Sequence, residues 1–236
     1  MRTGHSRLAA LRPARETLLW AAVVVNTELL LVLAYLVLAS PRFGDRSPWT
    51  VAAFYVYPFV WINAALVGVV RVRVPTAPAR RRLVAGAVAG GYLLVLAYAG
   101  GVFGFGGDGP VTGLRVVVAS LPPGWSPAVV YNGDTLRVAL LLFKVVGYLA
   151  LASLVYATVL DTAGSIAGGL VGLLSCVSCA LPVLAGVLSG FVGGTALVTA
   201  ASAQSYALST VAFVVTVGLL TWRPSLSTVR RLRQAL

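Results

Sequence analysis

The stretch GGLVGLLSCVSCALP, residues 168–182, carries both cysteines of the 236-residue chain inside an apolar run. With the apolar residues around it, this run is long enough to cross a bilayer as a helix. Cys176 and Cys179 are three positions apart, which places them on one face of a helix with their Cβ atoms roughly 5–6 Å apart. The stretch therefore predicts a membrane helix that carries two thiols side by side.

Pro182 follows the second cysteine closely and has no backbone N–H, so the carbonyl of Ser178 loses its helical partner. A proline in a helix interior usually kinks the helix. Broken helices at membrane depth occur where they are buried in protein or line a cavity. We therefore expect a helix break at Pro182, next to the thiols.

Three uses of the cysteine pair are open, and among the functional ones metal binding leads. Thiolates are soft ligands that select ions such as Cu(I) or Zn(II), as expected of a soft-metal carrier or insertion factor. A reversible disulfide between the two sulfurs would instead make the chain a thiol-redox membrane protein. Buried cysteines also occur as small hydrophobic side chains, which fits a structural or accessory subunit of a larger membrane complex.

The composition is that of a membrane protein, with 59% hydrophobic and 10% charged residues, whereas soluble domains average about 25% charged. Apolar runs long enough to cross a bilayer recur along the chain. They predict one all-α domain over residues 1–236, an integral membrane bundle of six transmembrane helices in contact with the lipid bilayer and, as a further candidate, with other membrane subunits. The expected spans are residues 17–39, 49–70, 83–105, 135–160, 166–188 and 195–222, and the expected extracytoplasmic loop is 106–134, in which Val116-Val117-Val118 indicates a short strand.

The net charge of +12 does not indicate a nucleic-acid partner here, because the arginines cluster at the ends of apolar runs. The N-terminal tail, residues 71–82 and the C-terminal tail hold 13 of the 18 basic residues, as four, five and four. Cytoplasmic segments of membrane proteins carry such an excess of arginine and lysine. The pattern predicts a multi-pass plasma-membrane protein with both termini in the cytoplasm.

Two ionisable residues, Glu28 and Lys144, are expected inside spans, where ionisable groups are costly and mark functional candidates. At about 1.5 Å per residue, Glu28 lies roughly 15 Å from the inner end of its span and Lys144 roughly 12–14 Å below the outer face. In a hydrocarbon core of about 30 Å, both lie near the depth expected for Cys176. An ion pair between Glu28 and Lys144 is open, and so is a purely structural role that locks two helices together.

The sequence lacks the residues that haem binding, nucleotide binding and hydrolytic catalysis require. The single histidine, His5, lies in the N-terminal tail, which rules out haem held by paired membrane histidines. The chain has no glycine-rich loop for a nucleotide phosphate, no Ser-His-Asp set and no paired carboxylates. The sequence therefore favours a protein that is not an enzyme, with a soft metal ion as the expected cofactor or cargo.

The last expected span carries hydroxyl side chains along one helical face, at positions 195, 199, 202, 206, 209 and 216. Such a row either lines a polar path for an ion or bonds back to its own and neighbouring helices. We favour the second, structural interpretation.

The run Ser175-Cys176-Val177-Ser178-Cys179 before Pro182 resembles uncharacterised membrane proteins of halophilic archaea, and the resemblance extends over about residues 123–224. That family has no assigned activity, so the resemblance implies archaeal relatives without implying a function. The cysteines before a proline are also similar, over a short stretch, to those of small mercuric-ion transport proteins, in which the two cysteines are adjacent. This second resemblance implies transfer of a soft metal ion.

Overall fold

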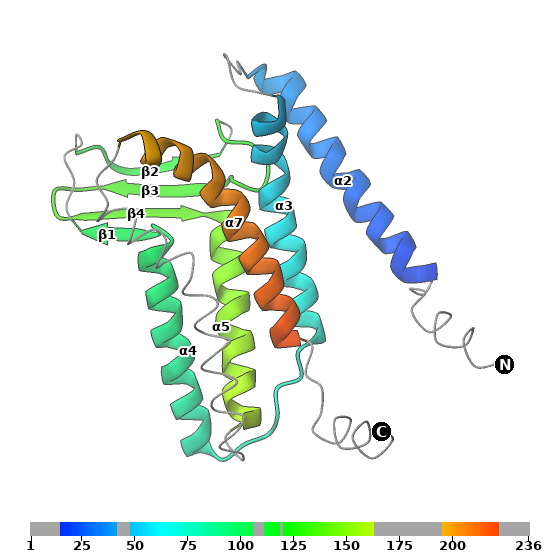
Figure 1. The fold of residues 1–236 in the computed structure, drawn as a ribbon, viewed down its shortest axis with the longest axis vertical. Helices are drawn as coiled ribbons and strands as arrows, with labels where there is room; N and C mark the ends of the chain where they lie inside the picture. The colour runs from blue at the N-terminus through cyan, green and yellow to red at the C-terminus, as the bar shows by residue number, and fades with distance from the viewer. Residues whose placement is uncertain (1–14, 42–47, 106–110, 119, 163–194, 222–236) are drawn as a thin grey trace. The chain divides into compact units, whose positions relative to one another are not determined.

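The computed structural model of the chain describes residues 15–41, 48–105, 111–118, 120–162 and 195–221. These residues form mostly helices, together with one small four-stranded sheet (Figure 1). In chain order the elements are α2 (Arg15–Ala39), α3 (Pro48–Arg71), α4 (Ala79–Ala99), β1 (Phe103–Phe105), β2 (Gly113–Val117), β3 (Ala128–Asn132), β4 (Leu136–Leu141), α5 (Leu142–Thr162) and α7 (Thr195–Thr221).

The chain divides into two compact units, Met1–Phe43 and Gly44–Leu236, and each is described by itself. The described part of the first unit is helix α2, whose bounds agree closely with the expected span 17–39. No residue of α2 is buried within the protein, although its sequence is apolar on every side. A helix that is hydrophobic all round is suited to a lipid environment.

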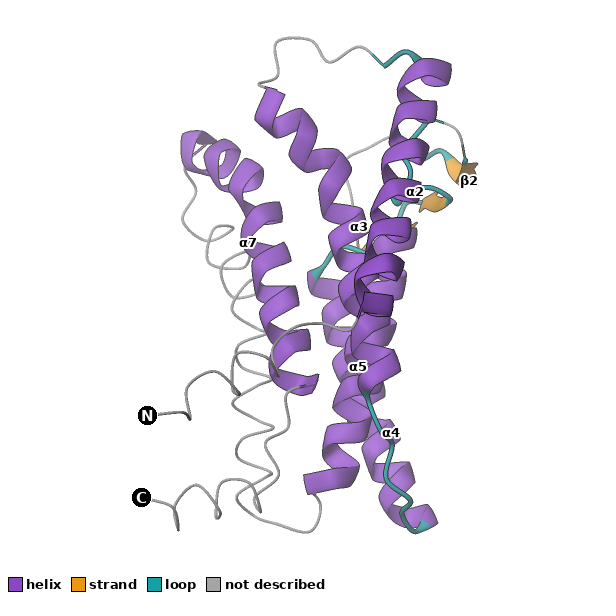
Figure 2. Cartoon of the chain, turned by 90° about the vertical axis from the view of Figure 1, so that its right-hand side faces the viewer, coloured by secondary structure: helices purple, strands orange, loops and turns teal. Residues whose placement is uncertain are grey.

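In the second unit, α3, α5 and α7 run in the same direction and α4 runs against them, as the colour gradient of Figure 1 shows. Figure 2 shows the same helices turned by 90°. Two successive layers of contacts along the three parallel helices show this common direction: Trp61, Gly147 and Phe213 form the first, and Gly68, Leu154 and Val217 form the second. Helix α4 is antiparallel because Gly100, at its C-terminal end, contacts Tyr148 near the start of α5. The sheet joins the end of α4 to the start of α5, and we call this end of the bundle the sheet end.

Four helices, α2, α3, α4 and α5, are long and apolar enough to cross a membrane. Helix α7 has nearly the bounds of the last expected span, and Ser209–Thr221 within it is a shorter apolar helix. The expected span 166–188 lies outside the described residues. The described residues therefore contain four membrane-length helices. The expected set of six spans is not confirmed.

The sheet corrects the expectation of an all-α fold. It is antiparallel, with the strand order β1-β4-β3-β2. Strands β3 and β4 form a hairpin through residues 133–135, and the Gly133 N–H donates to the Leu136 carbonyl over 3.0 Å. The strand expected around Val116 is confirmed as part of β2. The first residues of the expected span 135–160 form β4, so this span begins later, at Leu142.

Helix α4 ends before the expected boundary of span 83–105 because two glycines stop it. Gly101 has a φ of 68°, a left-handed conformation that glycine adopts without strain. The N–H of Gly101 donates to the Tyr98 carbonyl over 3.1 Å, and the N–H of Val102 donates to the Ala97 carbonyl over 2.8 Å. This pair of bonds is the Schellman arrangement that closes helix C-termini, and it directs the chain into β1.

The hydrophobic core lies where α3, α5 and α7 meet, and it continues to the sheet end through Val102 and Trp125. Helix α5 is the most enclosed of the candidate spans. Half of the residues in its most apolar segment are buried, compared with 17% for α4. Helix α5 therefore forms the centre of the bundle, and the exposed sides of its neighbours are available to lipid.

Candidate functional site

Cys176, Cys179 and Pro182, the residues of the predicted thiol site, lie outside the described residues. Their roles therefore stay predictions. Among the residues that the structure does describe, no group of three or more histidine, cysteine, aspartate or glutamate side chains is placed to hold a metal ion.

The two predicted intramembrane charges lie in different units, Glu28 in α2 and Lys144 in α5. Both side chains are half-buried. Because the units are described separately, the Glu28–Lys144 ion pair stays a prediction. The depth expected for Lys144 is corrected, however: α5 begins at Leu142, so Lys144 lies in the first helical turn at the sheet end instead of near the middle of a span.

Lys144 joins the start of α5 to the end of α4. Its ammonium group donates a hydrogen bond to the carbonyl oxygen of Gly100 over 2.7 Å. The last carbonyls of a helix have no helical donor and carry partial negative charge that favours a cation. Tyr148, one turn further along α5, packs so closely on Gly100 that a Cβ there would collide with the tyrosine hydroxyl. Lys144 and Tyr148 together fix the two helix ends.

A second junction at the sheet end is built on Pro58, inside α3. Proline has no N–H, so the carbonyl of Phe54, four residues earlier, has no helical donor. The indole N–H of Trp125 donates to this carbonyl over 2.9 Å. The Trp125 ring also stacks on the Phe54 ring, with centroids 4.5 Å apart and an interplanar angle of 25°. The segment between β2 and β3 thus supplies the hydrogen-bond donor that the proline lacks.

Gly124 allows this approach. Its φ is 86°, and a Cβ at this position would lie 2.6 Å from the Cβ of Pro58. Pro58 is among the largest fully buried side chains. Both the conformation and the contact require glycine, so the chain at Gly124-Trp125 is shaped to fit the proline face of α3.

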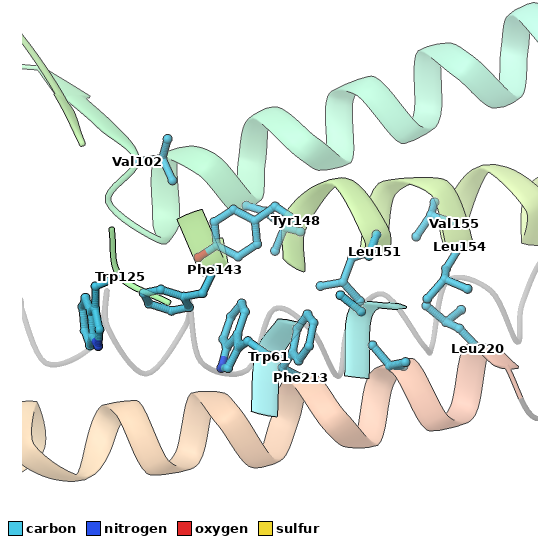
Figure 3. Packing of buried hydrophobic residues seen from close by; sticks show 14 residues of the cluster. Trp61, Val102, Trp125, Phe143, Tyr148, Leu151, Leu154, Val155, Phe213 and Leu220 are labelled. Atoms are coloured by element: carbon cyan, nitrogen blue, oxygen red, sulfur yellow. The ribbon is translucent and has the colours of Figure 1, made fainter. Parts of the chain in front are cut away.

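From this junction a row of aromatic rings runs into the bundle (Figure 3). We call the five rings of Phe54, Trp125, Phe143, Trp61 and Phe213 the aromatic row. Trp125 meets Phe143 edge-on at 4.8 Å, Phe143 meets Trp61 edge-on at 5.6 Å, and Trp61 stacks on Phe213 at 4.1 Å with an angle of 8°. These are the offset-stacked and edge-to-face geometries that aromatic rings prefer. The row ties α3, α5, α7 and the sheet segment together.

The one polar atom of Trp61 is satisfied inside this row. Its indole N–H donates to the hydroxyl oxygen of Thr210 in α7 over 3.0 Å, and the bond is buried. Gly147 of α5 makes room for the indole, since a Cβ there would lie 2.6 Å from the Trp61 ring. The hydrogen bond and the close approach therefore fix the relative position of three helices.

The described part of the site closes the sheet end of the bundle with hydrophobic rings. The aromatic row contains no ionisable side chain, and its two indole N–H groups are both hydrogen-bonded, as buried polar groups usually are. Four of the five rings are buried and Phe54 is exposed. The row holds the helices in place and supplies no group for acid–base chemistry. The described residues thus form an apolar, closely packed end of the helix bundle.

A family of unknown function, DUF7546, matches residues 1–227 of the chain. The chain belongs to DUF7546. The match covers nearly the whole chain, so the family includes the unit with α2 as well as the bundle and the sheet. No curated protein and no solved structure matches the sequence.

The family match bears on the two resemblances drawn from the cysteine run. Membership of DUF7546 agrees with a resemblance to an uncharacterised family and extends it beyond residues 123–224. The comparisons give no support to a haloarchaeal origin or to a similarity with mercuric-ion transport proteins. For this DUF7546 member, a metal function therefore rests on its own residues.

The sequence alone did not predict the residues that pack the sheet end of this DUF7546 bundle. Pro58 alone was a visible signal, because a proline within a span predicts a free carbonyl four residues earlier. The donor to that carbonyl, Trp125, is 71 positions away along the chain, and Thr210 is 149 positions from Trp61. Thr210 is also absent from the expected hydroxyl row, although Thr216 of that row is buried.

Proposed function

We propose that this member of DUF7546 is a six-span protein of the plasma membrane, with both termini in the cytoplasm, that carries or inserts a soft metal ion through Cys176 and Cys179. The observation that carries the proposal is the place of the only two cysteines in the chain. They lie in the apolar connection between α5 and α7.

The direction of the helices supports a membrane crossing by this connection. Helices α5 and α7 run in the same direction, so α5 ends at the end of the bundle opposite the sheet and α7 begins at the sheet end (Figure 1). A helix of the length of α5 covers roughly 30 Å at 1.5 Å per residue, about the thickness of the hydrocarbon core. If α5 and α7 both span the membrane, the chain between them passes through it once more.

The same directions support the proposed topology. Helix α3 ends and α4 begins at the end of the bundle opposite the sheet, so the arginine-rich residues 71–82 lie at that end. Helix α7 also ends there, and the basic C-terminal tail follows it. Basic segments gathered at one end are typical of the cytoplasmic side. The sheet then belongs to the outer side.

A site of two thiolates suits a carrier more than a permanent metal centre. Structural zinc sites are closed by four protein ligands, whereas two sulfurs leave coordination positions open for a donor or an acceptor. Thiolates select Cu(I) and Zn(II) over hard ions. Binding releases the thiol protons, since the thiolate is the ligand. In this proposal the aromatic row keeps water from the sheet end of the bundle while the ion is held.

The test is metal retention by the full chain, purified in detergent, fully reduced, and equilibrated without oxygen against Cu(I) or Zn(II) in the presence of a competing chelator. We expect near-stoichiometric retention, with proton release. Cys176→Ser and Cys179→Ser should each abolish it. Ser178→Ala, which changes a neighbouring side chain and keeps both sulfurs, is the matched control and should bind like the parent. Pro182→Ala should weaken binding less than either cysteine change.

Three results would contradict the proposal. Retention that is equal in the parent and in both cysteine variants would place the metal elsewhere. A disulfide that forms and breaks reversibly, with little metal retained, would favour the thiol-redox alternative. Thiols that neither bind metal, nor oxidise, nor react with maleimide would indicate a structural or accessory protein with inert cysteines.

A further inference from the structure

The four-stranded sheet has two chemically different faces. The register of the strands places Phe105 beside Leu136, Leu114 beside Tyr131, and Val116 in one row with Leu140. Paired residues of an antiparallel sheet point to the same side, and successive residues of a strand alternate between the sides. These six side chains therefore share one side, which we call the apolar sheet face. The opposite side carries Arg115 and Arg137.

The apolar sheet face is exposed. The opposite side is mixed: Ala128 is fully buried and Leu141 packs against the core, while Arg115 is exposed. On the apolar side, Phe105, Leu114 and Val116 are 76%, 68% and 63% exposed. A half-buried antiparallel sheet in water places its apolar residues inward and its polar residues outward. Here one face of the sheet turns its apolar residues outward, and large exposed apolar surfaces mark contact with a membrane or a protein.

The apolar sheet face continues directly from the outer surface of α4. Tyr98, in the last turn of α4, is 58% exposed, and its ring lies 5.8 Å from that of Phe103 and 6.5 Å from that of Phe105. Leu94, one turn earlier, is 63% exposed on the same helix. Tyrosine at the end of a membrane helix is typical of the lipid headgroup level. Within the described residues, the apolar surface thus passes from α4 over the rings of Tyr98, Phe103 and Phe105 onto the sheet.

We propose that the apolar sheet face lies against the lipid bilayer, at the boundary between headgroups and acyl chains beside α4. The proposal rests on the membrane insertion of the helices proposed above, and it is independent of the cysteine pair. Lipid is the occupant because this face is continuous with a surface that the spans themselves turn toward lipid. Elements with one apolar side and charges on the other bind in this interfacial layer, and burial of the exposed leucine, valine and phenylalanine side chains stabilises the contact.

The test is the depth of spin labels in the full chain, reconstituted into vesicles of equal parts phosphatidylcholine and phosphatidylglycerol. Labels are attached through Leu114→Cys or Phe105→Cys in a background with Cys176→Ser and Cys179→Ser. Arg115→Cys, the next residue of the same strand on the opposite side, is the matched control. Leu94→Cys on α4 reports whether the span itself lies in lipid. Accessibility to oxygen, which concentrates in lipid, is compared with accessibility to a water-soluble nickel complex.

We expect the labels at Leu114, Phe105 and Leu94 to be relaxed more by oxygen than by the nickel complex, and the label at Arg115 to show the reverse. A lipid-exposed label at Leu94 with water-exposed labels at Leu114 and Phe105 would overturn the sheet proposal alone. A water-exposed label at Leu94 would overturn the membrane assignment itself. Labels at Leu114 that are shielded from both agents and broadened by one another would show a second copy on this face, which also overturns the proposal.

Discussion

The indole N–H of Trp125 donates to the carbonyl of Phe54, the one acceptor that Pro58 leaves without its helical donor. Through this bond the segment between β2 and β3 holds the break in α3, and the aromatic row begins there. A proline that would otherwise weaken α3 is thus the point at which the sheet end is joined to the bundle. The stability of this junction can be tested residue by residue.

Replacing Trp125 with phenylalanine keeps a ring in the row and removes the donor to Phe54. A buried acceptor left without a partner costs about 1–3 kcal/mol, so Trp125→Phe should lower the free energy of unfolding in detergent by that amount. In a Pro58→Ala background a backbone N–H is again available to Phe54, and the same change should cost less. Trp49→Phe, at an 81% exposed tryptophan, is the control. Equal costs in both backgrounds would show that the hydrogen bond is unimportant.

Thr210 can be tested with two substitutions of opposite chemistry. Thr210→Val preserves the shape of the side chain and removes the acceptor of the buried Trp61 N–H, so it should cost about 1–3 kcal/mol of unfolding free energy. Thr210→Ser retains the hydroxyl and should recover most of the loss. Tryptophan fluorescence of the folded state checks that Trp61 stays buried. If serine were no better than valine, the hydrogen bond would not be the source of the effect.

Close helix packing at Gly147 predicts a contrast between two glycines. Gly147→Ala places a methyl group against the Trp61 ring, and overpacking of this kind costs typically about 1–3 kcal/mol. Gly218→Ala in α7 meets nothing within 4 Å, and alanine favours a helix over glycine by roughly 0.5–1 kcal/mol. Thermal unfolding in one detergent should therefore show Gly147→Ala below the parent and Gly218→Ala at or above it. Matching shifts for the two variants would contradict the described packing.

The pair Glu28–Lys144 is tested by a double-mutant cycle. Removing one partner of a buried ion pair leaves a lone charge and costs on the order of 3–5 kcal/mol. Glu28→Gln combined with Lys144→Met should then be more stable, and better expressed, than either single variant. The loss of the Lys144 bond to Gly100 occurs in Lys144→Met and in the double variant alike, so it cancels in the coupling energy of the cycle, which is the quantity that tests the pair. Purely additive losses would show that the two side chains do not meet.

The bounds of α2, α3 and α7 followed from the sequence because apolar runs in a membrane protein end at prolines, glycines or arginines. The start of α5 did not, since Leu136–Leu141 is as apolar as the helix after it. What makes these residues a strand is their pairing with β3 and β1, which local composition does not encode.

For the candidate site, too, local features were predictable from the sequence and contacts between distant residues were not. Pro58 is recognisable in the sequence as a helix breaker, and Lys144 as an ionisable residue within an apolar run, because each feature is local to a span. Their partners were not recognisable: Trp125 belongs to a segment expected to be loop, and Gly100 is 44 positions from Lys144. Contacts between distant residues depend on the packing of whole helices, and no pattern within one helix specifies them.

The central claim, a soft-metal site made of Cys176 and Cys179, is tested most directly by X-ray absorption spectroscopy of the metal-loaded, reduced full chain. We predict two sulfur neighbours of the bound ion, at about 2.3 Å if the ion is zinc, and loss of one sulfur or of the metal itself in Cys176→Ser. A spectrum with only nitrogen or oxygen neighbours, unchanged in Cys176→Ser, would contradict the claim.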